Sequence, residues 1–239
     1  MPPLFFQNTK RCGLYHGCTD KKKGVISMKY GYWTAKDRLR IMEQSVNGDL
    51  WRKSGFAIRG FEKILKDHSD FERLSLLFQM IAQEAQYDYT YKRRFRSSFV
   101  GALRDRNAVC AGFSELMVYL VSALTDYEIF YVRGKVHGSQ DFHAWNIIVI
   151  DGEGYMLDVT WALKNSAPKY FLRSETEVAL KKRDWDRDSL PACRKNYTTE
   201  DKKQEVMYQN QETLDRLCAY FRKLESAFNK TGDFAVDAV

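Results

Sequence analysis

The amino-acid sequence predicts a mixed fold in which helices come first, antiparallel strands follow, and a long helix closes the chain. Three observations support this order. Apolar residues recur with the helical period of 3.6 over residues 71–85 and again over residues 109–124. Runs rich in β-branched and aromatic residues then predict strands at 128–133, 142–150 and 154–161. The last two runs flank Asp151-Gly152, a dipeptide typical of a two-residue β-hairpin turn.

The first 50 residues are weakly patterned and rich in Gly, Lys and aromatic residues. They are expected to form an extension packed on the rest of the protein. Within them, residues 25–33 are predicted to form a strand and residues 35–43 a short helix.

The next helices carry clearer signals. Apolar positions predict a helix over residues 56–65. Ser69 and Glu72 form a capping box, so a second helix is expected to begin there and to end near Tyr87. Residues 97–103 then lead to the apolar helix that begins near Cys110.

The turn at Asp151-Gly152 predicts the register of the strands that it joins. With a two-residue loop, Ile150 faces Glu153, so His143 is expected to oppose Thr160 and Trp145 to oppose Asp158. The preceding strand is expected to stop at Gly134.

After Pro168 the pattern is irregular, with a short strand predicted at residues 170–172 and a helix at residues 199–228. The sequence shows no internal repeats and no low-complexity linker. We therefore expect a single domain over residues 1–239. Its expected parts are an extension (1–50), a core (51–195), and a C-terminal helix with its tail (196–239).

Cys110 is the candidate nucleophile. Asn107 is predicted to be the N-cap of its helix, which places Cys110 in the first turn. There the free backbone N–H groups and the positive end of the helix dipole favour a thiolate over a thiol. A cysteine at the start of an apolar helix is also typical of a buried residue without chemistry.

His143 and Asp158 are the candidate partners of this thiol. In the predicted register their side chains share one face of the hairpin on a diagonal, roughly 7–8 Å apart at the backbone, within reach of an imidazole–carboxylate hydrogen bond. His143 would take the thiol proton, and Asp158 would fix the imidazole tautomer. The alternatives are that His143 is a core histidine bonded to backbone, and that Asp158 is a capping or turn residue. His137 is a rival base, although no partner strand is predicted beside it.

Two further residues are candidates for substrate contacts. The Cys110 backbone N–H is expected to stabilise an oxyanion, and Asn107 is a candidate second donor because it is near in sequence. Trp145 is expected on the catalytic face, where it could wall the acyl site; packing is the alternative for Trp145 and for Trp161.

Composition limits the other classes of function. The chain has 239 residues, of which 44% are hydrophobic and 29% charged, and no stretch has the roughly 18 uninterrupted apolar residues of a membrane span. Its start does not resemble a signal peptide, so we expect a cytosolic protein or one whose leader precedes this sequence. The net charge of +7 is spread out without a nucleic-acid-binding motif, so no nucleic-acid partner is expected. Such a surface would suit an acidic protein partner or a bacterial wall polymer; oligomeric state is not indicated.

The other cysteines admit two interpretations. Cys12, Cys18, Cys193 and Cys218 could form two disulfides in an oxidising compartment or remain small apolar residues in a reducing one. Cys12, His16 and Cys18 have poor spacing for zinc and no evident fourth ligand. No metal or cofactor is expected.

These elements together resemble the transglutaminase-like superfamily in its microbial, papain-related form. Its pattern is a Cys-x-Gly-aromatic helix start, a His-Ala-Trp-Asn strand and an Asp-x-Thr-Trp strand. The matching residues are Cys110-Ala-Gly-Phe113, His143-Ala-Trp-Asn146 and Asp158-Val-Thr-Trp161. Further likeness lies at Asn107, residues 132–134, Asp151-Gly152, Tyr155, Tyr87, Tyr89, residues 170–174 and Trp185-Asp186. The resemblance covers about residues 70–195.

The resemblance implies an α+β, papain-like fold in which the Cys110 helix packs on an antiparallel sheet carrying His143 and Asp158. It also implies a cysteine-dependent acyl-transfer enzyme without a cofactor, acting on a protein or peptide substrate. Hydrolysis of peptide or carboxamide bonds is the first expectation, because water is always available to resolve a thioester. The alternatives are a cross-linking transglutaminase and a non-catalytic binding module. The chain departs from the pattern at Ala111, where a polar residue is more usual.

Overall fold

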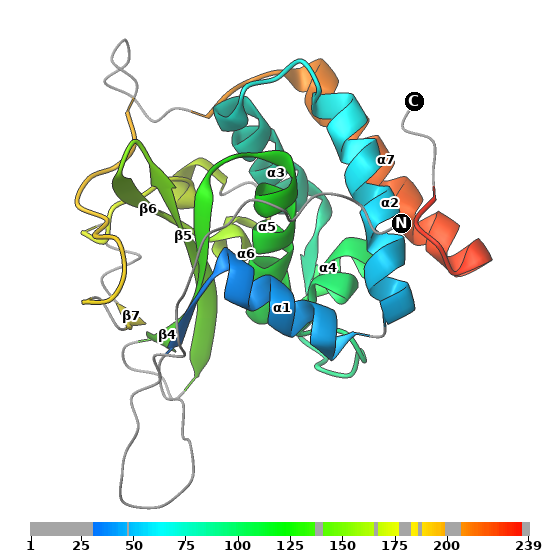
Figure 1. Ribbon diagram of the computed structural model, residues 1–239, viewed down its shortest axis with the longest axis horizontal. Helices are drawn as coiled ribbons and strands as arrows, with labels where there is room; N and C mark the ends of the chain where they lie inside the picture. The colour runs from blue at the N-terminus through cyan, green and yellow to red at the C-terminus, as the bar shows by residue number, and fades with distance from the viewer. Residues whose placement is uncertain are drawn as a thin grey trace, which may run out of the picture.

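An antiparallel sheet covered by helices forms the frame of the protein (Figure 1). The computed structural model describes residues 31–46, 48–136, 141–164, 167–176, 183–185, 188–198 and 207–235. Its helices are α1 (Ala35–Ser45), α2 (Gly48–Leu65), α3 (Asp70–Glu84), α4 (Phe99–Asp105), α5 (Cys110–Leu124), α6 (Val159–Ala162) and α7 (Gln211–Thr231), with a 3-10 turn at Ala167–Tyr170. Its strands are β1 (Gly31–Thr34), β2 (Gln86–Tyr87), β3 (Asn107–Ala108), β4 (Glu128–Val136), β5 (Phe142–Ile150), β6 (Glu153–Leu157) and β7 (Arg183–Asp184).

The main sheet has the strand order β1-β4-β5-β6, and β7 pairs with the end of β4. Every pair in it is antiparallel. The short strands β2 and β3 form a separate parallel pair. With helices packed on an antiparallel sheet, the fold is α+β, as the sequence predicts.

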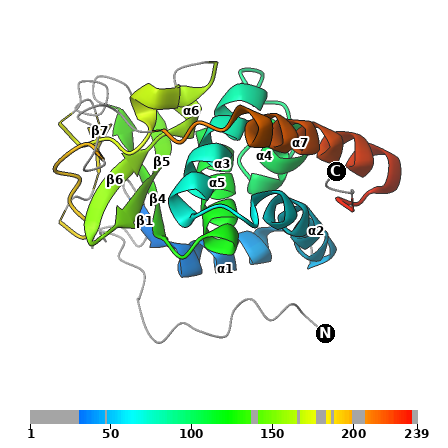
Figure 2. The ribbon, with the colours of Figure 1, turned by 90° about the horizontal axis from the view of Figure 1, so that it is seen from above.

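Helix α5 lies at the centre, between the sheet and the other helices (Figure 1). Its residues are apolar on almost every side and nearly all are buried, as expected of a helix enclosed by other elements. It packs on β4 and β5 on one side, and α2 and α7 lie on the side of α5 away from the sheet (Figure 2). The start of α5 is therefore held from several directions.

A second, smaller apolar cluster is formed on the other face of the sheet by the strand residues that alternate with those of the main core. Successive side chains of a strand point to opposite faces. Ile129 and Tyr131 of β4 belong to the main core, whereas Phe130 and Val132 pack in the second cluster with Trp145 of β5. Both faces of the sheet are thus covered by side chains.

The structure bears out the two sharpest sequence predictions. Ser69 and Glu72 form a capping box at the start of α3. The hairpin turns on Asp151 and Gly152, which both have positive φ, and Ile150 pairs with Glu153 as expected.

Several predicted boundaries were wrong. Helix α2 begins at Gly48, eight residues before the predicted start at position 56. Helix α3 ends at Glu84 rather than near Tyr87, because Gln86–Tyr87 pairs with Asn107–Ala108. Strand β4 does not stop at Gly134, since that residue still pairs with His143.

Two more corrections concern the second half of the chain. The strand predicted at residues 170–172 is absent: Tyr170 ends a 3-10 turn, and Leu172 has a φ of 50°, which no strand accommodates. Residues 207–210 lie inside the helix predicted at 199–228 but are not helical: α7 begins at Gln211, because the Asn210 side chain accepts the Thr213 N–H and caps it.

Candidate active site

Cys110 is the first residue of α5, as its sequence position predicts, but the predicted cap is wrong. Val109 is the N-cap, and it makes no side-chain capping bond. Asn107 instead lies in β3, paired with Gln86. A valine cap has no side-chain acceptor, so the cap does not occupy the N–H groups that a thiolate or an oxyanion would use.

The start of α5 is held by the segment that precedes α4. The Val109 N–H donates to the carbonyl oxygen of Arg96 at 2.9 Å. A Cβ on Gly112 would lie 2.7 Å from that same oxygen and 2.9 Å from the oxygen of Ser98. Glycine at position 112 thus allows the close approach that fixes the position of Cys110.

His143 and Asp158 lie together, in a different way from the expected diagonal of two paired strands. The Nε2 atom of His143 is 2.7 Å from Oδ2 of Asp158, and both side chains are buried, with residue exposures of 6% and 1%. Strand β6 ends at Leu157, one residue before the aspartate, and Asp158 caps α6. The expected pairing of His143 with Thr160 does not form, because Thr160 is helical.

Asp158 combines the two roles that were alternatives at the sequence level. Its Oδ1 accepts the backbone N–H of Trp161 at 3.0 Å and so caps α6, while its Oδ2 faces His143. The backbone N–H of Asp158 donates to the carbonyl oxygen of Tyr170 at 3.1 Å, which also fixes the backbone that carries this carboxylate.

The thiol of Cys110 interacts with His143. Burial alone raises the pKa of this thiol, but a hydrogen bond and the charge of His143, with a backbone hydrogen bond from Ala144, outweigh burial and lower the pKa below its ordinary value. Because Nε2 of His143 is committed to Asp158, Nδ1 is the ring nitrogen available to the thiol. The arrangement can hold a thiolate beside an imidazolium.

Two indole rings stack on the imidazole. The ring of Trp161 lies 5.1 Å from that of His143 with an interplanar angle of 23°, and the ring of Trp145 lies 6.0 Å away at 20°. Aromatic faces stabilise a nearby cation, so this packing favours protonated His143 and restricts its rotation. Trp145 has no exposed surface, so instead of walling an open acyl site it backs His143.

The other described cysteines differ from Cys110. Burial raises the pKa of Cys193 to about 12 and that of Cys218 to about 12. Neither is in a disulfide within the described part of the chain. The predictions that concern Cys12, Cys18, His16 and His137 lie outside the described residues.

Asn107 keeps one feature that bears on its predicted role as a second oxyanion donor. Its Oδ1 is buried and makes no hydrogen bond with any residue that the structure describes. Since an amide oxygen only accepts hydrogen bonds, this observation does not support the donor role, which stays a prediction for the Nδ2 group of Asn107.

Tyr87 lies next to the site, and the sequence does not predict this position of its side chain. Burial raises its pKa strongly, and the charge of Cys110 adds to this, which places the phenol near the thiol. The ring of Tyr89 lies 4.8 Å from that of Tyr87. The parallel pairing of β2 with β3 creates this proximity, and no local sequence pattern encodes it.

The described residues include neither a candidate membrane span nor a candidate metal site. No helix among them is long and apolar enough to cross a membrane. No group of three or more His, Cys, Asp or Glu side chains among them is arranged to hold a metal ion.

Comparison with known proteins gives little similarity. No family model and no curated protein matches the chain. Among solved structures, a proposed cysteine protease from Cytophaga hutchinsonii is similar with 17% identity and a TM-score of 0.38, over 58% of this chain and 51% of that one. A transglutaminase (TGase) is similar with 15% identity and a TM-score of 0.39, over 62% of this chain and 42% of that one. The match thus spans about half the length of these proteins.

Proposed function

We propose that this protein is a cysteine-dependent acyl-transfer enzyme that hydrolyses peptide or carboxamide bonds through a thioester on Cys110. The observation that carries the proposal is the connected series Cys110–His143–Asp158. The thiol has a lowered pKa through its hydrogen bond to His143, and the far nitrogen of that imidazole lies 2.7 Å from a buried carboxylate.

In the proposed reaction, the Cys110 thiolate attacks the carbonyl carbon, and the carbonyl oxygen becomes an oxyanion near the start of α5. The C–N bond then breaks, and imidazolium His143 gives its proton to the leaving amine or ammonia. His143 next removes a proton from water, which attacks the thioester. The C–S bond then breaks, so that a carboxylic acid leaves, the Cys110 thiolate is restored and His143 keeps the proton taken from water. Asp158 holds the imidazole tautomer throughout.

The Cys110 backbone N–H, at the first position of α5, is the proposed oxyanion donor, because an N–H in the first turn of a helix has no intrahelical partner. The side-chain N–H2 of Asn107, three residues before Cys110, remains the candidate second donor.

An activated acyl donor tests this proposal directly. We expect p-nitrophenyl acetate to acetylate Cys110 in a rapid burst, observable by mass spectrometry, followed by slower release of acetate. Adding cadaverine separates hydrolysis from amine transfer, because a transferase would divert the acyl group to N-acetylcadaverine. Absence of a Cys110 acyl adduct would favour a non-catalytic binding module, and unchanged turnover in Cys110→Ala would show that Cys110 is not the nucleophile.

A further inference from the structure

The loop of residues 88–96, between β2 and α4, borders the candidate nucleophile. At its start the Asp88 N–H donates to the carbonyl oxygen of Ala108 at 2.9 Å. At its end the Arg96 oxygen accepts the N–H of Val109 at 2.9 Å. Ala108 and Val109 immediately precede Cys110, so both ends of the loop are fixed to the backbone that leads into the nucleophile.

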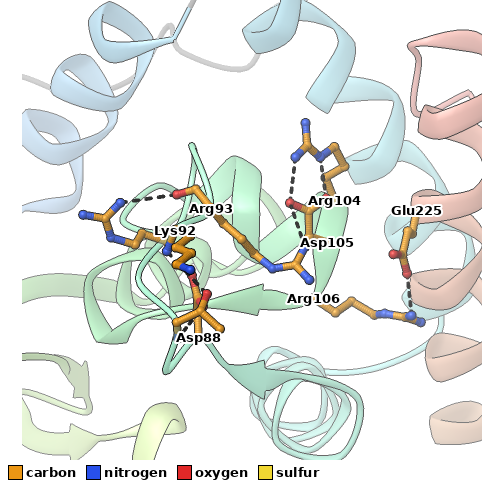
Figure 3. Close-up of polar contacts among 9 residues, drawn as sticks. Asp88, Lys92, Arg93, Arg104, Asp105, Arg106 and Glu225 are labelled. Carbon is orange, nitrogen blue, oxygen red and sulfur yellow. Dashed lines mark hydrogen bonds and ion pairs between the residues drawn. The ribbon is translucent and has the colours of Figure 1, made fainter.

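Asp88 organises the interior of this loop. Its carboxylate is buried, and its Oδ1 accepts both the N–H and the hydroxyl of Thr90, at 3.0 and 2.6 Å. These hydrogen bonds lower the pKa of Asp88, so its carboxylate stays charged and accepts hydrogen bonds inside the loop. Arg93 reaches toward Asp105 of α4, 4.0 Å away (Figure 3). The loop therefore has polar attachments on both sides.

The outer surface of the loop is cationic. Lys92, Arg93, Arg94 and Arg96 lie within five positions, whereas the one carboxylate of the loop, Asp88, is buried. Lys92 and Arg94 are exposed, and neither forms an ion pair with any residue that the structure describes. Their charges are available to a partner.

Exposed aromatic rings accompany these charges. Tyr89 is 77% exposed and Tyr91 57% exposed, and together with Phe142 they are the large hydrophobic side chains exposed in the described structure. Phe142 directly precedes His143, and Arg133 lies over its ring at 4.5 Å. The exposed aromatic surface is thus concentrated on the two segments that carry or border the site.

We propose that the loop of residues 88–96 binds an acidic segment of the polypeptide whose acyl group reaches Cys110. Lys92 and Arg94 would pair with carboxylates of that segment, and Tyr89 and Tyr91 would pack on its side chains. The assignment of the acyl group rests on the proposed function, whereas the binding itself does not need the chemistry. A polypeptide, unlike a nucleic-acid backbone, offers the carbonyl carbon and amine leaving group that the thiolate requires.

Binding can be measured without turnover in Cys110→Ala. The probe is a fluorescein-labelled dodecapeptide of glutamates around one central glutamine, and its counterpart has serine in place of glutamate. In fluorescence anisotropy we expect the acidic peptide to bind more tightly than the serine peptide, and added salt to weaken it. We expect Lys92→Glu/Arg94→Glu to weaken its binding roughly tenfold. Tyr89→Ala/Tyr91→Ala is expected to weaken it several-fold.

The matched control is Lys63→Glu/Lys66→Glu, which changes net charge equally with two exposed residues, one in the last turn of α2 and one directly after it. Equal weakening in both charge-reversal variants would reveal general charge attraction and overturn the proposal. Tighter competition by a single-stranded DNA of similar charge, or no preference for glutamate over serine, would also overturn it. Iodoacetamide labelling of Cys110 in the wild-type protein tests the chemistry separately: an unreactive Cys110 would contradict the proposed function and would leave the binding result standing.

Discussion

The imidazole of His143 lies with Nε2 2.7 Å from Oδ2 of Asp158, while Oδ1 of the same carboxylate caps helix α6 through the N–H of Trp161. These two roles can be separated by one substitution. Asn in place of Asp retains a side-chain acceptor for the cap but lacks the charge that holds the tautomer.

We therefore expect Asp158→Asn to keep its melting temperature within a few degrees of the wild type. Its rate of Cys110 acylation should fall about 10²- to 10⁴-fold, because the imidazolium loses its carboxylate partner. Circular dichroism during thermal unfolding measures the melting temperature, and stopped-flow kinetics measure the acylation rate. An unchanged melting temperature together with an unchanged acylation rate would mean that Asp158 acts only as a cap.

The stacking of Trp161 on His143 predicts a smaller, graded effect. Removing the ring in Trp161→Leu should lower the Cys110 alkylation rate by roughly 2- to 30-fold, since about 0.5–2 kcal/mol of cation–π stabilisation is lost. Trp161→Phe, which keeps an aromatic face, should restore most of the rate. If the two variants react equally fast, the stacking has no part in activating the thiol.

Gly112 is expected to tolerate no side chain. A Cβ there would approach the Arg96 and Ser98 carbonyl oxygens to below 3.0 Å, so Gly112→Ala should destabilise the fold by about 1–3 kcal/mol and slow Cys110 alkylation. Gly55 of α2 is the matched control, because its Cβ would meet nothing within 4 Å. Gly55→Ala should stabilise the protein by about 0.5–1 kcal/mol. Urea denaturation of both variants distinguishes the two; similar free energies of unfolding would refute the close approach.

A buried ion pair helps to hold α5. Glu115 is 4% exposed, its Oε1 is 2.5 Å from Arg38 of α1, and its Oε2 accepts the Phe99 N–H at 2.8 Å. Arg38→Met leaves a buried carboxylate without its counter-ion and should cost about 3–5 kcal/mol. Arg52→Met removes an equally short but exposed pair with Asp49, and should change stability by less than about 1 kcal/mol.

The pH dependence of Arg38→Met has a definite sign. Burial raises the pKa of Glu115 above its ordinary value, against the opposing effect of Arg38. Without Arg38 the pKa should rise further, so the folded protein takes up a proton that the unfolded chain lacks. The loss of stability is therefore fully present above this raised pKa and shrinks as the pH falls through it toward the ordinary value near 4.3. A loss that grows on acidification would contradict this account.

The sequence predicts those parts of the site that depend on local chemistry. The Ser69–Glu72 capping box and the Asp151-Gly152 turn are encoded by neighbouring residues, and the turn transmits its register along β5 and β6. That register alone does not yield the end of β6. The strand ends because Asp158 caps α6, and Asp is a residue type that favours the N-cap position.

Contacts between distant segments are beyond such reasoning. The pairing of Gln86 with Asn107 brings Tyr87 toward Cys110 and ends α3 early, and neither partner has a long strand pattern. The expected Asn107 cap was wrong for the same reason, because tertiary pairing overrides a local preference for capping.

Site-resolved alkylation tests the central claim most directly. Iodoacetamide is applied from pH 4 to 9, and each cysteine is followed by mass spectrometry. Because His143 lowers the pKa of the Cys110 thiol, alkylation of Cys110 should be rapid well below the ordinary thiol pKa of about 8.5. Cys193 and Cys218, with pKa values raised to about 12, should remain unmodified and serve as internal controls. His143→Ala should move the Cys110 profile up to that of an ordinary or buried thiol. An inert Cys110, or a profile that His143→Ala leaves unchanged, would contradict the activated thiolate on which the proposed function rests.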